Sequence, residues 1–186
     1  AGVYAITNHM RGSDLGFASP LIYSGSRSAA YGSVIRDVNT GSNGYYQGGQ
    51  NYDLVTGWGS PDAELFAASL SGQLRKVDIT SSISGSYTIN VDGRWYTAPR
   101  TLWFASGTAH TFAANTTVSG PPSVRYIFTS WSGLSTGPEP TKSLQIVQNG
   151  SLTLLYKTQY LVSVFGGSQP FSDWFDEGST PTISSQ

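Results

Sequence analysis

A change of pattern near Leu74 limits what this chain can fold into. Before that residue, apolar side chains recur at helical spacing between glycine-rich segments; after it, they alternate with polar residues, and turn residues follow at short intervals. Period-two alternation places the apolar side chains on one face of a strand. The sequence therefore predicts an α+β, mostly β chain: a smaller part with helices, then an antiparallel β-sandwich with an immunoglobulin-like arrangement.

Eight strands are expected after Leu74, and two dipeptides are expected to join neighbouring strands. Asp92-Gly93 and Asn149-Gly150 are of the kind that adopts the left-handed conformations of tight hairpin turns. The expected strands are Val77–Ser81, Tyr87–Val91, Leu102–Ala105, His110–Ala114, Val124–Thr129, Ser143–Val147, Ser151–Tyr156 and Tyr160–Phe165.

The part before Leu74 carries two helix patterns. Val3, Ile6 and Met10 fall on one face of a helix over residues 1–12, which Gly12 is expected to end. A second helix is expected to start with Ser60 as its N-cap and Pro61 at its first position, and to end at Gly72. A short strand, Val34–Arg36, is expected to lead into the segment between the helices.

The segment from Asp37 to Pro61 has the composition of a cation-binding loop. Calcium takes about six to eight oxygen ligands, which an irregular loop supplies more easily than a helix or strand does. The candidate ligands are the carboxylates of Asp37 and Asp53 and the carbonyl oxygens of Val38, Gly49 and Asn51. Aspartate and glycine also make ordinary turns, so the residues alone leave a plain loop as the alternative.

Asp37-Val38, followed by Gly-Gly-Gln-Asn-Tyr-Asp-Leu-Val-Thr-Gly-Trp-Gly-Ser-Pro at 48–61, resembles the calcium-loop signature of sedolisin-type serine-carboxyl peptidases, acid-active relatives of subtilisin. In that family an Asp, the carbonyl of the next residue, two glycyl carbonyls and a second Asp bind Ca²⁺. The resemblance implies the same five ligands. Asn51 replaces one of the glycines, but a carbonyl ligand does not depend on its side chain, and asparagine tolerates unusual backbone angles.

The start of the chain extends the resemblance. Ala-Gly-Val-Tyr-Ala-Ile-Thr-Asn at 1–8 is similar to the helix that directly follows the nucleophile segment of these peptidases, and residues 16–23 resemble the segment after it. The resemblance implies that residues 1–72 are the C-terminal part of a subtilisin-like α/β catalytic domain, followed by a β-sandwich at 73–165. The β-part also resembles, more loosely, the C-terminal repeats of secreted proteins of thermophilic archaea, which implies an extracellular or cell-surface protein.

No catalytic residue is assigned within the chain. The family implies a serine nucleophile in a Gly-Thr-Ser segment with a glutamate base, and neither that segment nor the Glu-x-x-x-Asp pair occurs here, so cleavage of a protein substrate would need the remainder of the catalytic domain. His9 and His110 fall in different expected domains, which favours structural roles. With no cysteine, a zinc site is not expected.

An internal repeat marks the end of the chain. Tyr87-x-x-x-Val91 with Trp103-Phe104-x-x-Gly107 is echoed by Tyr160-x-x-x-Val164 with Trp174-Phe175-x-x-Gly178 and then Thr182-Ile183, so residues 166–186 are expected to begin a second β-repeat or to form an exchanged strand. The rival functional reading is a structural filament or surface-layer protein in which Phe165–Gln186 joins a neighbouring copy by β-strand addition. The acids at Asp173, Asp176 and Glu177 are expected in a solvated loop.

Composition excludes some partners. Only 11% of the residues are charged and the net charge is −1, so the sequence predicts neither a nucleic-acid partner nor a membrane-binding basic stripe, and no membrane span is visible. The triplets at Asn115 and Asn149 match the N-glycosylation pattern, which also occurs by chance. A carbohydrate-binding β-module is a third reading, supported by aromatic content alone.

Overall fold

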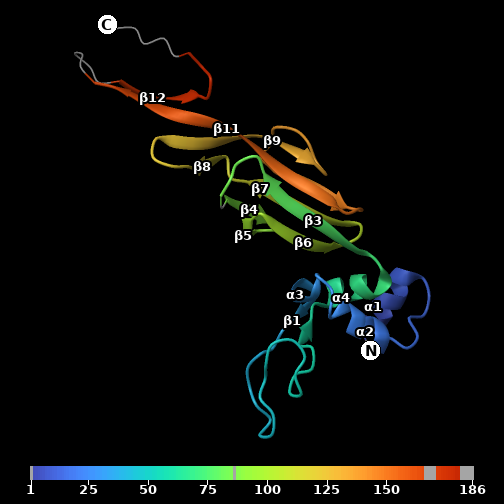
Figure 1. The fold of residues 1–186 in the computed structure, drawn as a ribbon. Helices are drawn as coiled ribbons and strands as arrows, with labels where there is room; N and C mark the ends of the chain where they lie inside the picture. The colour runs from blue at the N-terminus through green and yellow to red at the C-terminus, as the bar shows by residue number, and fades with distance from the viewer. Residues whose placement is uncertain (1, 86, 166–170, 181–186) are drawn as a thin grey trace. The chain divides into compact units, whose positions relative to one another are not determined.

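The computed structural model describes residues 2–85, 87–165 and 171–180. The chain divides into two compact units (Figure 1). Unit 1 contains Ala1–Val77, Leu102–Thr108 and Gln145–Asn149, and unit 2 contains Asp78–Thr101, Ala109–Leu144 and Gly150–Gln186. The chain is rich in antiparallel β-structure with a smaller helical part, as the sequence predicts.

Unit 1 is built on four helices: α1 (Gly2–Arg11), α2 (Ser19–Gly25), α3 (Tyr31–Val34) and α4 (Ala63–Ser71). Helix α4 is the hub, because α1, α2 and α3 all pack against it. Ala67 and Ala68 are fully buried, and their small side chains allow the neighbouring helices to approach closely.

The ends of the helices follow local signals. Gly12 ends α1 at a φ of 70°, and Gly72 ends α4 at a φ of 75°, both as expected. The prediction for the start of α4 was wrong by two residues. Its N-cap is Asp62, whose carboxylate accepts the backbone N–H of Leu65 at 3.0 Å, whereas Ser60 and Pro61 form a strand instead.

Helix α1 does not bury the apolar stripe that its sequence indicates. Its one buried residue is Thr7, whose hydroxyl donates to the carbonyl oxygen of Val3 at 2.9 Å. Ile6, which belongs to the expected apolar face, is 44% exposed. Val3 and Met10 are half-buried and share the face of Thr7, so the buried face is centred on Thr7 and leaves Ile6 outside it.

Two sheets account for most of the β-structure. The four-stranded sheet has the order β10-β7-β4-β5, with β4 at Tyr87–Val91, β5 at Arg94–Ala98, β7 at Thr108–Ala114 and β10 at Thr141–Ile146. The six-stranded sheet contains β6 (Arg100–Ala105), β3 (Leu74–Ser81), β11 (Gly150–Val164), β9 (Val124–Gly133), β8 (Thr117–Ser119) and, beside β11, β12 (Phe171–Asp176).

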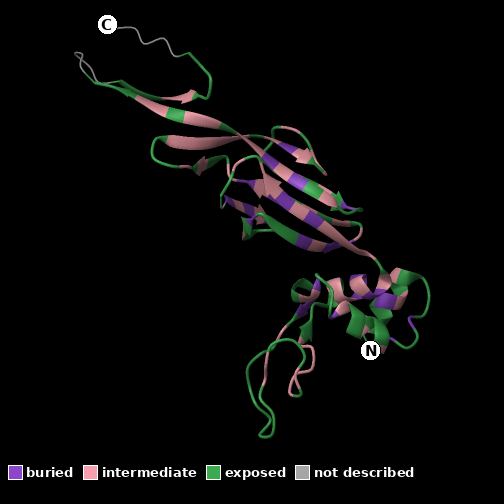
Figure 2. Ribbon diagram, viewed as in Figure 1, coloured by how far each residue is buried: buried purple, intermediate pink, exposed green. Residues whose placement is uncertain are grey.

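The buried side chains of unit 2 alternate along strands of both sheets (Figure 2). Each sheet thus has one more apolar face. The fully buried side chains on these strands include Ile79, Ile89, Phe112, Leu152 and Leu154, with Trp131 at 2% exposure. The β-sandwich with its immunoglobulin-like arrangement stays a prediction.

One of the two expected hairpins is present. Asp92-Gly93 joins β4 to β5, and both residues have the positive φ that a tight hairpin turn needs, 51° and 82°. The hairpin expected at Asn149-Gly150 was wrong, because the strands on either side, β10 and β11, belong to different sheets. The sequence also missed β5 and β8, and it split β11 into two strands.

Half of the internal repeat has a structural counterpart. Trp103-Phe104 in β6 and Trp174-Phe175 in β12 each precede a glycine with positive φ, Gly107 at 85° and Gly178 at 76°. The other half does not correspond, because Tyr87–Val91 lies in the four-stranded sheet and Tyr160–Val164 in the six-stranded sheet. Thr182 and Ile183 lie outside the described residues.

Candidate metal centre

The expected calcium loop is a long segment of unit 1 whose two ends lie side by side (Figure 1). We call the paired ends, residues 35–36 and 59–61, the neck. Strand β1 (Ile35–Arg36) pairs antiparallel with β2 (Ser60–Pro61), with Arg36 opposite Ser60. Gly59 has a φ of 100°, and a Cβ at this position would lie against the carbonyl oxygen of Arg36. The neck therefore requires glycine at residue 59, for both its conformation and the close approach of two backbones.

The far end of the loop closes on itself and contributes nothing to the expected ligand set. Ser42 and Gln47 form an antiparallel bridge, and the side-chain oxygen of Asn43 accepts the backbone N–H groups of Tyr45 and Tyr46 at 3.1 and 2.9 Å. Tyr45 is 93% exposed. This tip is an ordinary polar turn, and the expected ligands lie between it and the neck.

Asp53 organises the returning half of the loop. Its Oδ1 accepts the backbone N–H groups of Val55 and Thr56, both at 2.7 Å, and its Oδ2 accepts the N–H of Gly49 at 3.1 Å and the hydroxyl of Thr56 at 2.9 Å. These bonds, above all the backbone bond from Thr56, lower the pKa of Asp53 to about 2. The carboxylate is thus held in its charged form, as a cation ligand must be.

Asp37 differs from Asp53 because one of its carboxylate oxygens accepts no hydrogen bond from the described residues. Its Oδ2 accepts the backbone N–H of Asn51 at 2.8 Å, which ties the outgoing strand to the returning half of the loop. Its Oδ1 is buried and has no hydrogen-bond partner among the residues that the structure describes. A buried carboxylate oxygen without a donor is unfavourable unless something positive faces it, so this atom is the strongest sign of a cation.

Thr56 connects the two halves of the site. Its hydroxyl oxygen lies 3.0 Å from the carbonyl oxygen of Val38 and 2.9 Å from Oδ2 of Asp53. The hydroxyl has one proton and two acceptors, so it can serve only one of them at a time. Because both acceptors lie within hydrogen-bond distance of one hydroxyl, the carbonyl oxygen of Val38 is also close to Oδ2 of Asp53.

The two carboxylates share one further neighbour. The pKa of Tyr31 is raised, first by burial and then by the negative charges of Asp37 and Asp53. The negative charges of both aspartates thus act on one phenol hydroxyl, which itself donates to the carbonyl oxygen of Trp58 at 2.7 Å. Hydrogen bonds link Gly49 to Asp53 and Asn51 to Asp37, and the Thr56 hydroxyl lies between Val38 and Asp53.

The residues present fit a calcium ion with one adjustment. A carboxylate offers about four acceptor sites, and four donors already occupy those of Asp53. If the Thr56 hydroxyl donates to Val38 instead, one site on Oδ2 of Asp53 becomes free for a cation. Asn51 has a φ of 65°, the left-handed conformation that the sequence argument allows for asparagine at this ligand position.

Sequence reasoning did not identify Thr56, Tyr31 or Trp58. The spacing Asp53-x-x-Thr56 just before Gly57 was the available signal, because aspartate commonly caps the N–H groups two and three residues on. Trp58 has a buried indole N–H without a partner in the described part of the chain, and its ring contacts those of Tyr23, Tyr31 and Tyr52 at centroid distances of 5.8, 5.9 and 5.3 Å. Nothing in the sequence pattern placed this aromatic cluster beside the loop.

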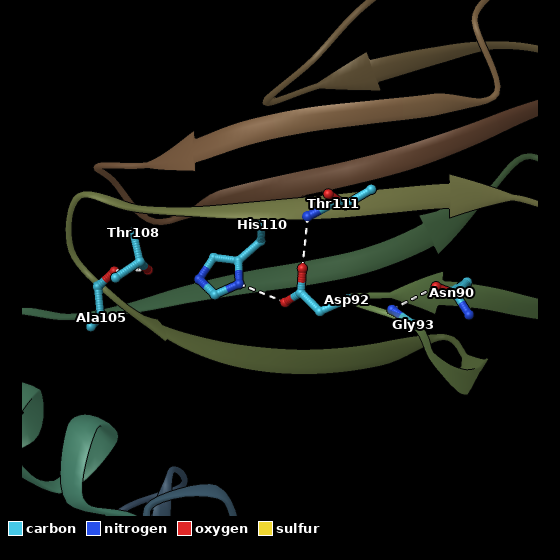
Figure 3. A network of polar contacts seen from close by, with 7 residues as sticks. All are labelled: Asn90, Asp92, Gly93, Ala105, Thr108, His110 and Thr111. Atoms are coloured by element: carbon cyan, nitrogen blue, oxygen red, sulfur yellow. Dashed lines mark hydrogen bonds and ion pairs between the residues drawn. The ribbon is translucent and has the colours of Figure 1, made fainter.

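His110, one of the two histidines, lies at the β4–β5 turn. In unit 2, Nδ1 of His110 lies 2.7 Å from Oδ2 of Asp92, whose Oδ1 accepts the backbone N–H of Thr111 at 2.8 Å (Figure 3). The side-chain oxygen of Asn90 accepts the N–H of Gly93 in the same turn. The aspartate therefore holds the β4–β5 turn against β7, which agrees with a structural role for His110.

The C-terminal acids are exposed, as expected, but two of the three lie in a strand and not in a loop. Asp173 and Asp176 lie in β12, and Asp176 accepts hydrogen bonds from Lys157 at 2.8 Å and from Gln159 at 2.6 Å. Glu177 accepts the hydroxyl of Tyr160 at 3.4 Å. Across residues 2–85, 87–165 and 171–180, no three His, Cys, Asp or Glu side chains come together as a metal-binding group. The candidate site at the loop, with two carboxylates, is of a different type.

Among the helices described, none has the length and apolar character needed to cross a membrane. Comparisons of this chain with protein-family models, curated proteins and solved structures found no match. The peptidase resemblance therefore stays a prediction, and the geometry of the loop carries the functional argument.

Proposed function

We propose that this chain is the C-terminal portion of a secreted, sedolisin-like serine peptidase, and that its 37–61 loop binds calcium through Asp37, Val38, Gly49, Asn51 and Asp53. The observation that carries the calcium part is Oδ1 of Asp37, a buried carboxylate oxygen without a donor. The peptidase part rests on the resemblance of the residues, with the catalytic groups supplied by the remainder of the catalytic domain. The β-rich unit 2 would act as a stabilising or surface-binding module.

Calcium would stabilise the loop by joining its two halves. In the apo chain the halves are connected by a few hydrogen bonds, chiefly Asn51 to Asp37 and Thr56 to Val38. A cation shared by Asp37 and Asp53 would also remove the repulsion between their charges. Because the ion binds the folded loop and not the unfolded chain, it adds about 2.7 kcal/mol of stability when its free concentration is a hundred times the Kd.

Terbium luminescence is the direct test. Tb³⁺ replaces Ca²⁺ at oxygen-rich sites. Trp58 lies in the loop and Tyr31 is hydrogen-bonded to it, so we expect both to sensitise Tb³⁺ emission when they absorb light. We expect saturable emission that Ca²⁺ displaces, together with a calcium-dependent rise in the melting temperature. Asp37→Asn should abolish both effects, because it replaces the unpaired oxygen by an amide group.

Two further variants separate binding from folding. Thr56→Val removes the hydroxyl that occupies Asp53, so we expect a less stable apo loop, by about 1 kcal/mol, that still binds Ca²⁺. Asp14→Asn is the matched control, since Asp14 is an exposed acid of unit 1 outside the loop, and it should leave the titration unchanged. A wild-type chain that shows no displaceable emission and the same melting temperature with and without chelator would refute the calcium site.

The peptidase part has its own test, which is the intact mass of the protein purified from its natural source. A mass well above 19.8 kDa, with casein cleavage at acid pH, would support the larger catalytic domain. A mass near 19.8 kDa would contradict it. The calcium result does not depend on this outcome.

The strand-exchange reading gains no specific support. Strand β12 is already paired antiparallel with β11 of the same chain, from Gln159 opposite Asp176 to Val164 opposite Phe171. Donating this segment to a neighbour would first break that pairing. Part of the proposed donor, residues 166–170 and 181–186, lies outside the described residues.

A further inference from the structure

The C-terminal hairpin of unit 2 presents an apolar face around one acid. Strand β11 runs past the start of β9 at Val124, and its last residues pair only with β12 among the strands described. Residues opposite each other in an antiparallel pair point to the same face. The register therefore gathers on one face a set of side chains that we call the hairpin face: Tyr160, Val162, Val164, Phe171, Asp173 and Phe175.

The hairpin face continues the face of β11 that carries its buried side chains, but its own side chains are more exposed. Leu152 and Leu154, at the same alternate positions of β11, are fully buried, whereas Tyr160, Val164 and Phe171 are 43, 38 and 38% exposed. Figure 2 shows no buried residue along the β11–β12 extension. A two-stranded hairpin with an open apolar face is marginal by itself, which favours a partner.

The internal repeat indicates which face should be covered. Phe104 of β6 and Phe175 of β12 are corresponding residues, each in a strand that neighbours the preceding long strand of the six-stranded sheet. Phe104 is 6% exposed. The side chain at this position is therefore covered in the first repeat, whereas the corresponding Phe175 is only half-buried.

The acid in the hairpin face is available for an ionic partner. Asp173 lies opposite Val162, and the one contact that its carboxylate makes among the described residues is with the backbone N–H of Trp174, at 2.7 Å. The nearby Asp176, by contrast, is already paired with Lys157. A partner for this face should thus combine aromatic or aliphatic side chains with a positive charge.

Unit 2 carries a surface of that kind beside strand β5, the edge of the four-stranded sheet. The guanidinium groups of Arg94, in β5, and of Arg100, at the start of β6, lie 5.4 and 5.2 Å from the ring centre of Tyr96. Arg94 and Tyr96 lie on one face of the sheet, and neither arginine has a carboxylate partner within the described residues. We call this surface, Arg94, Tyr96 and Arg100, the basic edge.

We propose that the hairpin face of one molecule docks the basic edge of a second copy of this chain. Charge complementarity supports the choice, because Asp173 would gain an arginine while Phe171 and Phe175 pack on Tyr96 and the aliphatic stems of the arginines. The two surfaces are different patches of one unit, so the contact is head-to-tail and generates open chains rather than closed dimers, unless the rotation closes a ring. This proposal does not rest on calcium binding or on peptidase ancestry.

Sedimentation velocity over a wide range of concentrations tests the contact. We expect the wild-type chain to form a ladder of oligomers that shortens as NaCl is raised to about 0.5 M, because salt screens the Asp173–arginine pair. Asp173→Lys should weaken association by roughly tenfold or more, since it places like charges together. The double variant Arg94→Ala, Arg100→Ala should weaken it from the other side.

Mixing the two variants separates a head-to-tail contact from a symmetric one. The Asp173→Lys chain keeps its basic edge and the arginine double variant keeps its hairpin face, so the mixture has one functional pair of surfaces. We expect a 1:1 dimer that grows no further. Glu64→Lys and the double variant Arg11→Ala, Arg27→Ala are the charge-matched controls in unit 1, and both should assemble like wild type.

Phe171→Ser tests the apolar part, and circular dichroism checks that each variant is folded. This substitution should weaken association while leaving the Asp173–arginine pair available. A wild-type chain that stays monomeric at every concentration would overturn the proposal. So would oligomers that survive both charge variants unchanged, or a variant mixture that forms the full ladder.

Discussion

Tyr31 donates its hydroxyl to the carbonyl oxygen of Trp58 at 2.7 Å, joining helix α3 to the returning end of a loop 27 residues further along the chain. This bond crosses the neck of the loop, next to the carboxylates of Asp37 and Asp53. It is one of the contacts that keep the candidate metal centre in place before any cation arrives. Tyr31 is therefore both a structural link and a reporter of local charge.

The ionisation of Tyr31 should respond to calcium. Burial and the charges of the two aspartates raise its pKa above the usual value of 10.0, so the phenol resists ionisation. A bound Ca²⁺ would reverse the contribution of the aspartates, and we expect the pKa of Tyr31 to fall. Absorbance at alkaline pH, taken as the difference between wild type and Tyr31→Phe, measures this shift with and without calcium.

The same variant has a stability effect. Tyr31→Phe leaves the Trp58 carbonyl without its donor, at a cost of about 1 kcal/mol measured by urea denaturation. Tyr4→Phe, on the exposed side of α1, is the matched control and should cost nothing measurable. An equal pKa in the presence and absence of Ca²⁺ would show that the ion does not bind beside Tyr31.

The titration of Asp53 should make unit 1 less stable at low pH. Its pKa lies near 2 in the folded chain, below the ordinary 3.8, because backbone N–H groups hold the carboxylate charged. The stabilisation is therefore fully present above pH 3.8 and is lost as the pH falls through 2. Melting temperatures from pH 5 to 2 should decline more steeply for wild type than for Asp53→Asn, which lacks this titration. Parallel curves would contradict the assignment.

Some parts of this fold could be predicted from the sequence because local chemistry decides them. Asp92-Gly93 adopts its turn and Gly72 ends its helix because few other residues reach a positive φ. Asp37 and Asp53 likewise accept backbone N–H groups within the loop, because aspartates commonly hold nearby N–H groups by hydrogen bonds. These features depend on neighbours in the sequence.

Features that depend on distant residues could not be predicted in the same way. Helix α1 buries Thr7 because α4 packs against that side, and Asn149-Gly150 does not form a hairpin because β10 and β11 join different sheets. The unpaired state of Oδ1 of Asp37 likewise arises from burial between segments far apart in sequence. Local patterns contain no information about such contacts.

Substitutions at two glycines, one in each unit, should destabilise the two units separately. Gly59→Ala would force a Cβ against the Arg36 carbonyl at a φ of 100°, so we expect a loss of roughly 2–4 kcal/mol and weak or absent Tb³⁺ binding. Gly133→Ala makes the equivalent clash with the carbonyl of Ser151 at a φ of 96°, in unit 2. It should destabilise unit 2 comparably and leave Tb³⁺ binding intact. Loss of binding in both variants would mean that the loop is not an independent site.

The two glycosylation triplets should behave differently in a secreted, folded product. Asn149 is exposed, and its side-chain oxygen accepts the N–H of Lys76 at 2.8 Å, so its amide nitrogen can carry a glycan on the surface. Asn115 is partly buried, and its amide nitrogen already donates to the hydroxyl of Thr88 at 2.6 Å. A glycan there would have to displace this bond inside the packed end of β7. After expression in a glycosylating host, peptide mass spectrometry should find glycan at Asn149 and none at Asn115, and Asn149→Gln should remove all of it. Glycan at Asn115 in folded material would show that the Thr88 contact does not protect the site.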